Sequence, residues 1–395
     1  MTGLAAAILG ALALLVLLPT LVLFIEVLMA CLPARLPPAA RVPRPRLAVL
    51  VPAHDEASII IATLDSIRAQ LCEGDRLLVV ADNCTDDTAA LARAAGAEVV
   101  ERFDAQARGK GYALDFGVRY LGFDPPPVIV VVDADCQLGD GALTRLATCC
   151  IDSGRPVQAL YLMQSPEGAG LKTRVAEFAW RVKNLVRPRG WARLGLPCQL
   201  MGAGMAFTWR DLASLELASG HLVEDLKMGL DLCRIGKAPL FCPDAMVTSW
   251  FPVSNEGLGA QRRRWEHGHL GVLLKDAPRL LIESLARRNG ALLALALDLM
   301  VPPLALLVLA LAGVFCLSWL AWLLLDVSTA PWLASCAVVL LGIAVLLAWY
   351  RFCRGLIAFS VLLYAPLYAA KKIPIYLGFL VKRQVDWVRS KRDGN

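Results

Sequence analysis

The chain has 395 residues, of which 57% are hydrophobic and 19% charged, and its formal net charge is +6. Its mean hydropathy of +0.57 is high for a soluble protein. The excess lies in residues 4–29 and 291–381, whereas residues 46–290 have the composition of a soluble domain. The twelve cysteines are scattered, without a CxxC pair or a Cys/His cluster, which argues against a disulfide scaffold and a zinc site.

Residues 4–29 form one apolar run, interrupted only by Glu26, that is long enough to cross about 30 Å of hydrocarbon. A cleaved signal peptide would have a basic start and a shorter apolar core. Four arginines follow the run: Arg35, Arg41, Arg44 and Arg46. Because positive charge stays inside, we predict a transmembrane helix over residues 1–30 that ends in the cytosol, then a Pro-rich linker over 31–46.

Three further apolar runs cover residues 291–325, 331–350 and 355–381. The connection at Asp326 carries no Lys or Arg and suits the outside, whereas Arg351 and Arg354 suit the inside. A third crossing would put the basic tail outside, so we expect an interfacial or re-entrant segment there. The sequence thus predicts a C-terminal membrane region over 286–395, with two or three hydrophobic segments, in a multi-pass protein of the inner (plasma) membrane. Anionic lipid, rather than nucleic acid, then accounts for the net positive charge.

The middle of the chain alternates strands and helices. Residues 47–51, 77–81 and 128–132 have strand patterns, and residues 57–70 and 86–95 have helical spacing. This order predicts an α/β domain with a mostly parallel sheet and helices on both faces, whose ligands lie beyond the carboxyl ends of the strands. The first turn contains no glycine, which excludes a dinucleotide-binding fold of the dehydrogenase type.

Asp133-Ala-Asp135 ends the most apolar of these strands. Alternation puts both carboxylates on one side, where they can bind one Mg²⁺ or Mn²⁺ ion together with a substrate diphosphate. A DxD string also occurs about once by chance in a chain of this length. The position at the end of a buried strand favours a metal site.

Two residues near other strand ends are candidates for nucleotide binding. Asp82 ends the second strand and either caps the next helix or hydrogen-bonds a base or ribose, and Asp86 is the better-placed cap. Lys110 lies between two glycines before a helical stretch, a pattern that suits either a bound base or phosphate or a solvated turn.

Glu224 and Asp225 open a helical segment. The helix macrodipole alone favours acidic residues there. The alternative is that Asp225 is a general base that takes a proton from a substrate hydroxyl.

The string Gln261-Arg-Arg-Arg264-Trp265 places an amide, a guanidinium and an indole on one helical face. Arg264 suits a diphosphate and Trp265 a sugar ring, although the same string suits a membrane-interface anchor. Gly202 and Gly204 permit close backbone approach, in this interpretation by an acceptor.

These strings, in this order, resemble the membrane-integrated family 2 glycosyltransferases, such as the cellulose, hyaluronan, chitin and poly-N-acetylglucosamine synthases. Residues 51–56 resemble the family's opening strand and turn, Asp82 its first nucleotide-binding aspartate, and residues 109–111 its Lys-containing loop. Residues 133–135 resemble its metal motif, residues 224–225 the pair whose Asp is the base, and residues 261–265 its QxxRW signature. Two pairs depart from the usual pattern: His54-Asp55 and Asn83-Cys84.

The resemblance implies a cytosolic nucleotide-binding domain of the GT-A type over residues 47–285. It implies a catalytic role for Asp225, with Glu224 beside it, and a Mg²⁺ or Mn²⁺ ion on Asp133 and Asp135. The implied donor-binding residues are Pro52, Ala53, Glu56, Asp82, Lys110, Asp133, Gln261 and Arg264. The implied acceptor-binding residues are Trp265, Gly202 and Gly204.

The implied activity is metal-dependent, inverting transfer of a hexosyl or N-acetylhexosaminyl group from a UDP-sugar to a growing exopolysaccharide or oligosaccharide at the cytosolic membrane face. The implied partners are the UDP-sugar donor, a saccharide or lipid acceptor, membrane lipids and other subunits of a polysaccharide synthesis or export complex. Two alternatives stay open. One is a single addition to a lipid acceptor, as in ceramide-glucosyltransferase-like enzymes, and the other is a non-catalytic nucleotide-sugar-binding subunit of an export complex.

Overall fold

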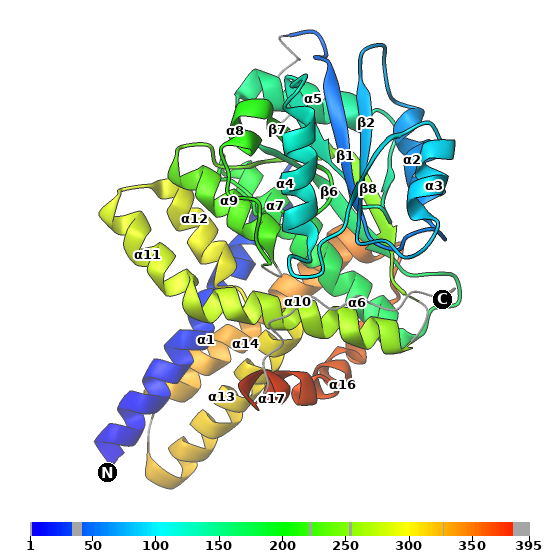
Figure 1. Cartoon of the computed structure of the whole chain (residues 1–395). Coiled ribbons are helices and arrows are strands. Elements are labelled where there is room, and N and C mark those ends of the chain that lie inside the picture. The colour runs from blue at the N-terminus through cyan, green and yellow to red at the C-terminus, as the bar shows by residue number, and fades with distance from the viewer. Residues whose placement is uncertain (1, 34–41, 221–222, 253–254, 327, 382–395) are drawn as a thin grey trace. The chain divides into compact units, whose positions relative to one another are not determined.

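A computed structural model describes residues 2–33, 42–220, 223–252, 255–326 and 328–381 (Figure 1). Most of the linker and the basic tail lie outside the described residues, as do the side chains of residues 2, 255–262, 264 and 380. The chain divides into two compact units. Of the described residues, the sheet unit comprises those within 42–166 and 196–265, and the helical unit comprises those within 2–33, 167–195 and 266–381.

The sheet unit contains one eight-stranded sheet in the order β3-β2-β1-β4-β7-β6-β8-β5. Its strands are β1 (Leu47–Ala53), β2 (Arg76–Asp82), β3 (Glu98–Arg102), β4 (Val128–Val131), β5 (Gln137–Leu138), β6 (Val157–Gln164), β7 (Met205–Thr208) and β8 (Leu240–Trp250). Strands β3, β2, β1 and β4 are parallel neighbours, β6 is parallel to β8, and β7 runs antiparallel between β4 and β6. The predicted α/β fold class is confirmed, with a mixed half that the sequence pattern did not show.

Helices cover the sheet, which explains why β1 and β4 are almost entirely buried. They are α2 (Ile60–Arg68), α3 (Thr88–Ala94), α4 (Lys110–Leu121), α5 (Ala142–Ser153), α8 (Trp209–Ala213) and α9 (Glu224–Arg234). One hydrophobic core joins α4, α8 and α9 to alternate residues of the central strands, such as Leu50, Val80 and Val131. Right-handed crossovers put α2 and α3 on the opposite face from α4, as Figure 1 shows.

A glycine brings α4 close to the sheet. A Cβ atom on Gly117 would lie 2.5 Å from Leu50 Cδ1 and 2.9 Å from Val80 Cγ2. Because Lys110 is the first residue of α4, this contact also fixes the position of the Lys110 backbone relative to the sheet.

The helical unit contains the remaining helices. They are α1 (Thr2–Ala30), α6 (Leu171–Arg181), the π-helix η1 (Val182–Val186), α7 (Arg187–Arg193), the second half of α10 (Asn255–Lys275), α11 (Ala277–Ala286), α12 (Gly290–Leu299), α13 (Leu304–Leu325), α14 (Thr329–Ala348), the π-helix η2 (Trp349–Cys353), α15 (Phe359–Leu363), α16 (Ala365–Ala370) and α17 (Ile373–Val381).

Three helical segments among the described residues are long and apolar enough to cross a membrane: Gly3–Ala30, Leu304–Leu325 and Thr329–Cys353. Helix α1 packs against both α13 and α14. Its residues Ala6 and Leu9 pack against Ala321 and Ala330, so the N-terminal end of α1 lies beside the α13–α14 connection. Helices α1 and α14 therefore run in the same direction. Helices α15 to α17 are each too short to cross a bilayer.

The two acidic residues within the apolar runs form a buried ion cluster with one arginine. Arg187 Nε on α7 donates to Glu26 Oε2 on α1 at 3.0 Å, and Arg187 Nη2 donates to Asp298 Oδ1 on α12 at 2.5 Å. All three residues are buried. An isolated charge is costly in such surroundings, and this pairing reduces the cost. We refer to Glu26, Arg187 and Asp298 as the membrane triad.

Candidate active site

The candidate site lies where the order of the sheet strands reverses. Strands β2 and β4 lie on either side of β1. Asp82 is the last residue of β2, Asp133 follows β4 by two residues, and Glu56 follows β1 by three. In parallel sheets this is the position of the ligand-binding crevice.

Four chain segments converge at the centre of this site. Lys110 Nζ, at the start of α4, contacts Asp133 Oδ1, donates to the backbone oxygen of Gly202 at 2.8 Å and lies 3.9 Å from Glu224 Oε1. Glu224 and Asp225 are the first two residues of α9. We refer to Lys110, Asp133, Asp135, Glu224 and Asp225 as the acidic cluster.

Gly202 lies in the middle of the acidic cluster. Its backbone has φ +94°, and a Cβ atom there would lie 3.5 Å from Asp225 Oδ2 and 3.8 Å from both Asp133 Oδ2 and Lys110 Nζ. A side chain at this position would be strained and would fill the space between the two carboxylates.

Gly204 has a different environment. It is buried, and a Cβ atom there would lie 2.6 Å from Val247 Cγ2 and 2.7 Å from Ala159 Cβ. Neighbouring strands thus fill the space that the sequence interpretation gave to an acceptor. Gly204 allows close packing of the sheet, and its acceptor-binding role stays a prediction.

Asp133 and Asp135 have the geometry of a divalent-cation site. One ligand atom each from Asp133, Asp135 and Cys136 lie within 4.8 Å of one another. Burial raises the pKa of the Cys136 thiol well above its usual value, with a further rise from the two neighbouring aspartates, so the sulfur stays protonated. The available ligands are therefore carboxylate oxygens, the type that Mg²⁺ and Mn²⁺ prefer. This agrees with the predicted cofactor.

Burial and crowding shape the charges of the cluster. Burial raises the pKa of Asp133, and the positive charge of Lys110 opposes the rise. Burial also raises the pKa of Glu224 to about 7, opposed by Lys110 and increased by Asp225. Four carboxyl groups share one ammonium group, so the site has an excess of negative charge that a divalent cation would neutralise.

Asp82 is buried and tied to a residue that the sequence did not indicate. Arg102 Nη1, from the last residue of β3, donates to Asp82 Oδ1 at 2.6 Å. Asn83 Nδ2 donates to the same oxygen at 3.0 Å. Asp82 therefore stands at the strand edge as a charge-paired, oriented carboxylate.

The two pairs that depart from the family pattern lie together after β1 and β2. The backbone N–H of Asp55 donates to Cys84 Sγ at 3.4 Å, and His54 Nδ1 lies 2.6 Å from the backbone oxygen of Asp82. Asp55 and Asn83 both have left-handed backbones, with φ +51° and +53°, which Asp and Asn tolerate better than most residues. The departures thus form one connected arrangement beside Asp82.

Residues 43–268, more than half of the chain, match the model of the family described as glycosyltransferase like family 2. The chain belongs to this family. No curated protein matches it.

Among solved structures, the glycosyltransferase is similar to mannosyltransferase PcManGT from Pyrobaculum calidifontis in complex with GDP-Man and Mn²⁺. The two share 19% identity over 92% of this chain and 98% of the other, with a TM-score of 0.55. Glucosyl-3-phosphoglycerate synthase from Mycobacterium tuberculosis in complex with Mn²⁺, UDP and phosphoglyceric acid shares 22% identity over 62% of this chain and 79% of the other, with a TM-score of 0.38. The first likeness shows a common fold of the GT-A type.

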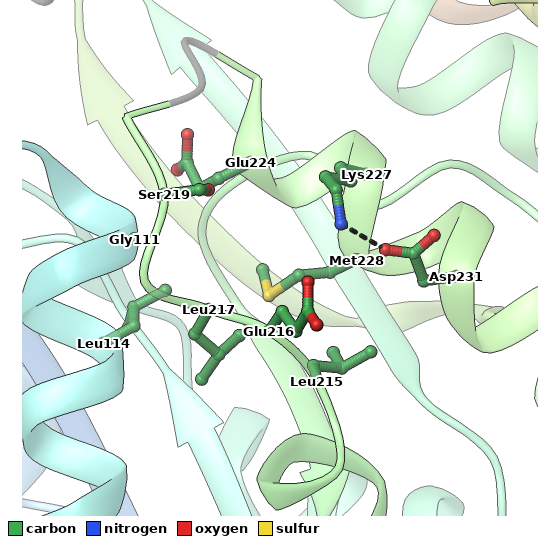
Figure 2. A pocket seen from close by; sticks show the side chains of 10 residues that line it. All are labelled: Gly111, Leu114, Leu215, Glu216, Leu217, Ser219, Glu224, Lys227, Met228 and Asp231. Atoms are coloured by element: carbon green, nitrogen blue, oxygen red, sulfur yellow. Dashed lines mark hydrogen bonds and ion pairs between the residues drawn. The ribbon is translucent and has the colours of Figure 1, made fainter.

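Helix α9 of the glycosyltransferase also borders a pocket, which Figure 2 shows. Its empty volume is about 270 Å³, including space open to solvent. The lining residues are Gly111, Leu114, Leu215, Glu216, Leu217, Ser219, Glu224, Lys227, Met228 and Asp231. Lys227 Nζ and Asp231 Oδ2 form an ion pair of 2.6 Å at one side. Glu224 belongs to both the acidic cluster and this pocket.

The other predicted donor and acceptor residues are placed as follows. Pro52 and Ala53 end β1, and the backbone N–H of Glu56 donates to Thr88 Oγ1 at 2.7 Å, which fixes the turn after the strand. Trp265 is half-buried on α10. The side chains of Gln261 and Arg264 lie outside the described residues.

One further residue contacts the carboxylates of the candidate metal site. Ser249 Oγ, on β8, donates to Asp135 Oδ2 at 3.4 Å. Strand β8 pairs with β5, which follows the DxD segment, and this pairing brings Ser249 to the site. No local sequence pattern indicated this residue.

Proposed function

We propose that this family 2 glycosyltransferase catalyses metal-dependent, inverting transfer of a hexosyl or N-acetylhexosaminyl group from a UDP-sugar to a saccharide acceptor at the cytosolic face of the inner membrane. The observation that carries the proposal is the convergence of Asp133, Asp225 and Lys110 around Gly202. These residues come from separate segments, and they supply a metal ligand, a base and a cation within one small space.

The donor lies, in this proposal, along the carboxyl ends of β1, β2 and β4. Asp133 and Asp135 would hold Mg²⁺ or Mn²⁺, which would supply positive charge to neutralise the departing diphosphate. The Asp82 carboxylate binds the base or ribose, with Arg102 fixing its orientation. Lys110 is close enough to Asp133 to share the diphosphate with the metal site.

Asp225 is assigned as the general base. Its Oδ1 accepts a hydrogen bond from the backbone N–H of Leu226 at 2.8 Å, which orients the carboxylate, while its Oδ2 faces Gly202. The acceptor hydroxyl loses its proton to Asp225 as its oxygen bonds to the anomeric carbon. The bond between that carbon and the donor phosphate oxygen breaks, and UDP leaves with the electron pair. One displacement without a covalent intermediate inverts the configuration.

The acceptor side is proposed to include Gly202 and the pocket on α9. Glu224 joins this pocket to the acidic cluster, and Ser219, Lys227 and Asp231 offer hydrogen-bonding groups for sugar hydroxyls. Trp265, Gln261 and Arg264 are assigned to the acceptor and the diphosphate on the sequence pattern alone. The lining combines these polar groups with apolar side chains such as Leu215 and Met228, a mixture that a sugar ring would suit.

A lipid acceptor is the second candidate. It is favoured by the three candidate membrane-spanning segments among the described residues, because a lipid acceptor would already lie in the bilayer that they cross. The membrane face follows from the arginines after α1 and from Arg351 and Arg354, which the positive-inside tendency places in the cytosol.

Product sizing from a radiolabelled UDP-sugar decides between these reactions. Membranes that contain the protein are incubated with the donor and Mn²⁺, and the products are separated by size and solubility in organic solvent. A ladder of polar products indicates chain elongation, whereas one lipid-soluble product indicates a single addition. Tight UDP binding with no product of either kind would instead support the non-catalytic subunit.

A further inference from the structure

Arginines gather where α1 and α14 end, and the proposed reaction does not use them. The two helices run side by side in the same direction. Residues 1–34 and 304–350, which contain α1, α13 and α14, have no Lys or Arg. Positive charge begins just beyond them, with Arg351 and Arg354 after α14 and Arg189 on α7.

Helix α7 is fixed tightly against the last turns of α1. A Cβ atom on Gly190 would lie 2.0 Å from the backbone oxygen of Glu26, so the two backbones touch and only glycine fits. Arg187, three residues earlier, joins α7 to α1 and α12 through the membrane triad. The position of Arg189, between these two contacts, is therefore set before any ligand binds.

Arg189 and Arg351 converge on the end of α1. Arg189 Nε donates to the backbone oxygen of Ala30 at 3.1 Å, and its guanidinium lies 5.8 Å from the centre of the Phe352 ring. Burial raises the pKa of the Cys31 thiol, and the charges of Arg351 and Arg189 both oppose the rise. The contact with Phe352 also places Arg189 beside the segment that carries Arg351.

Among the described residues, the charges of these three arginines have no acidic partner. In the part of the chain that the structure describes, no carboxylate forms an ion pair with Arg189, Arg351 or Arg354. The hydrogen bond from Arg189 to the Ala30 backbone oxygen is explained by capping of the C-terminus of α1. Capping does not account for the exposed Arg351 and Arg354, of which the latter lies 4.8 Å from the centre of the Tyr350 ring.

We propose that Arg189 and Arg351, with Arg354 beside them, bind the phosphate group of an anionic phospholipid. Guanidinium groups match phosphate oxygens with two parallel hydrogen bonds, and an amphipathic ring such as that of Tyr350 is favoured at headgroup level. A phospholipid fits better than free phosphate, because its acyl chains can lie along the exposed apolar surfaces of α1 and α14. The inference does not rest on the proposed transferase reaction.

The test is native mass spectrometry of the full-length protein in detergent micelles, with phosphatidylglycerol or phosphatidylcholine added. The wild type is expected to retain phosphatidylglycerol in preference to phosphatidylcholine. Each arginine at an anionic surface contributes about fivefold in affinity, so the double variant Arg189→Gln/Arg351→Gln should bind phosphatidylglycerol about 25-fold more weakly.

Two variants keep this test free of folding effects. Arg351→Gln alone alters an exposed side chain and should weaken binding about fivefold. The double variant Arg279→Gln/Arg288→Gln removes two exposed arginines elsewhere in the helical unit and should bind like the wild type. Equal binding by the Arg189→Gln/Arg351→Gln protein and the wild type would overturn the proposal. Displacement of phosphatidylglycerol by millimolar inorganic phosphate would also overturn it, since free phosphate would then be the ligand.

Discussion

The sheet unit and the helical unit each bury a group of charged side chains. The two groups differ in the ratio of acidic to basic side chains and in how open they are to a ligand. In the acidic cluster, four carboxyl groups share Lys110, and the carboxylates face a glycine and a pocket. In the membrane triad, two carboxylates share Arg187, and all three side chains are at most 8% exposed.

The difference indicates what each group is for. The acidic cluster has an excess of negative charge and lies beside a pocket, so a bound cation would neutralise it and a substrate could enter. This arrangement fits a site that binds both. A buried group of ions whose members pair with one another instead specifies how helices pack. The first should therefore affect turnover when altered, and the second should affect stability.

The largest effect is expected from Asp225→Asn. The amide cannot take the proton of the acceptor hydroxyl, so we expect kcat to fall by about 10²- to 10⁴-fold. UDP should still bind with nearly the wild-type affinity, as measured by calorimetry in the presence of Mn²⁺. Purified Asp225→Asn protein that turns over at the wild-type rate would remove Asp225 from its assigned role.

Arg187→Met tests the other side of the comparison. Loss of the guanidinium leaves Glu26 and Asp298 buried without a cation, and we expect the free energy of unfolding of the helical unit to fall by about 3–5 kcal/mol. Thermal unfolding in micelles measures the loss. Adding Glu26→Gln and Asp298→Asn to Arg187→Met should recover most of it. A single variant as stable as the wild type would show that the triad does not hold the helices.

Ser249→Ala tests the support of the metal site. The hydroxyl donates to Asp135 Oδ2, so its removal should weaken Mn²⁺ binding about 10- to 100-fold without removing a ligand. Titration of activity with Mn²⁺ measures the change, and saturating Mn²⁺ should restore much of the rate. Thr248→Ala, one residue earlier on β8, is the matched control. An unchanged Mn²⁺ requirement in Ser249→Ala would separate Asp135 from the metal.

Arg102→Gln should have the smallest effect of the four. It removes the charged partner of Asp82, and we expect the KM for the donor to rise about tenfold with little change in kcat. Arg102→Lys keeps the charge and should show a smaller rise. A fall in kcat at an unchanged KM would mean that Arg102 acts on the chemical step instead of on donor binding.

Local patterns were sufficient to predict the parallel half of the sheet. Strands β1, β2 and β4 are short apolar runs, and the predicted ranges agree with them to within about two residues at each end. The predicted helix over 86–95 begins at Thr88, and Asp86 Oδ1 accepts a hydrogen bond from the Thr88 backbone N–H at 3.0 Å. Because the carboxyl ends of parallel strands meet at one edge of a sheet, the positions of Asp82 and Asp133 at that edge could also be predicted.

The rest depends on contacts between distant parts of the chain. Arg102 and Ser249 lie on β3 and β8, which the sequence pattern did not reveal, because β3 is only half-buried and β8 has an irregular burial pattern. Gly202 and Gly204 are two residues apart, yet only one faces the acidic cluster.

The membrane triad shows the same limit. Asp298 lies in an apolar run, where an ionisable group is costly, but its partner Arg187 is 111 residues away, and Glu26 is 161 residues from Arg187. No local rule joins such positions. The sequence analysis assigned residues 167–195 and 266–285 to the GT-A domain, whereas in the structure they cluster with the apolar helices. Their helices are amphipathic, and this pattern is also typical of helices in a soluble domain.

A donor screen tests the central claim most directly. Purified protein in lipid nanodiscs is supplied with Mn²⁺, an oligosaccharide or lipid acceptor, and one labelled donor at a time from a set of UDP-sugars and GDP-mannose. Mass analysis of the products should show transfer from at least one UDP-sugar, and EDTA should abolish it. Transfer that persists in EDTA, or tight UDP binding with no transfer from any UDP-sugar, would contradict the account.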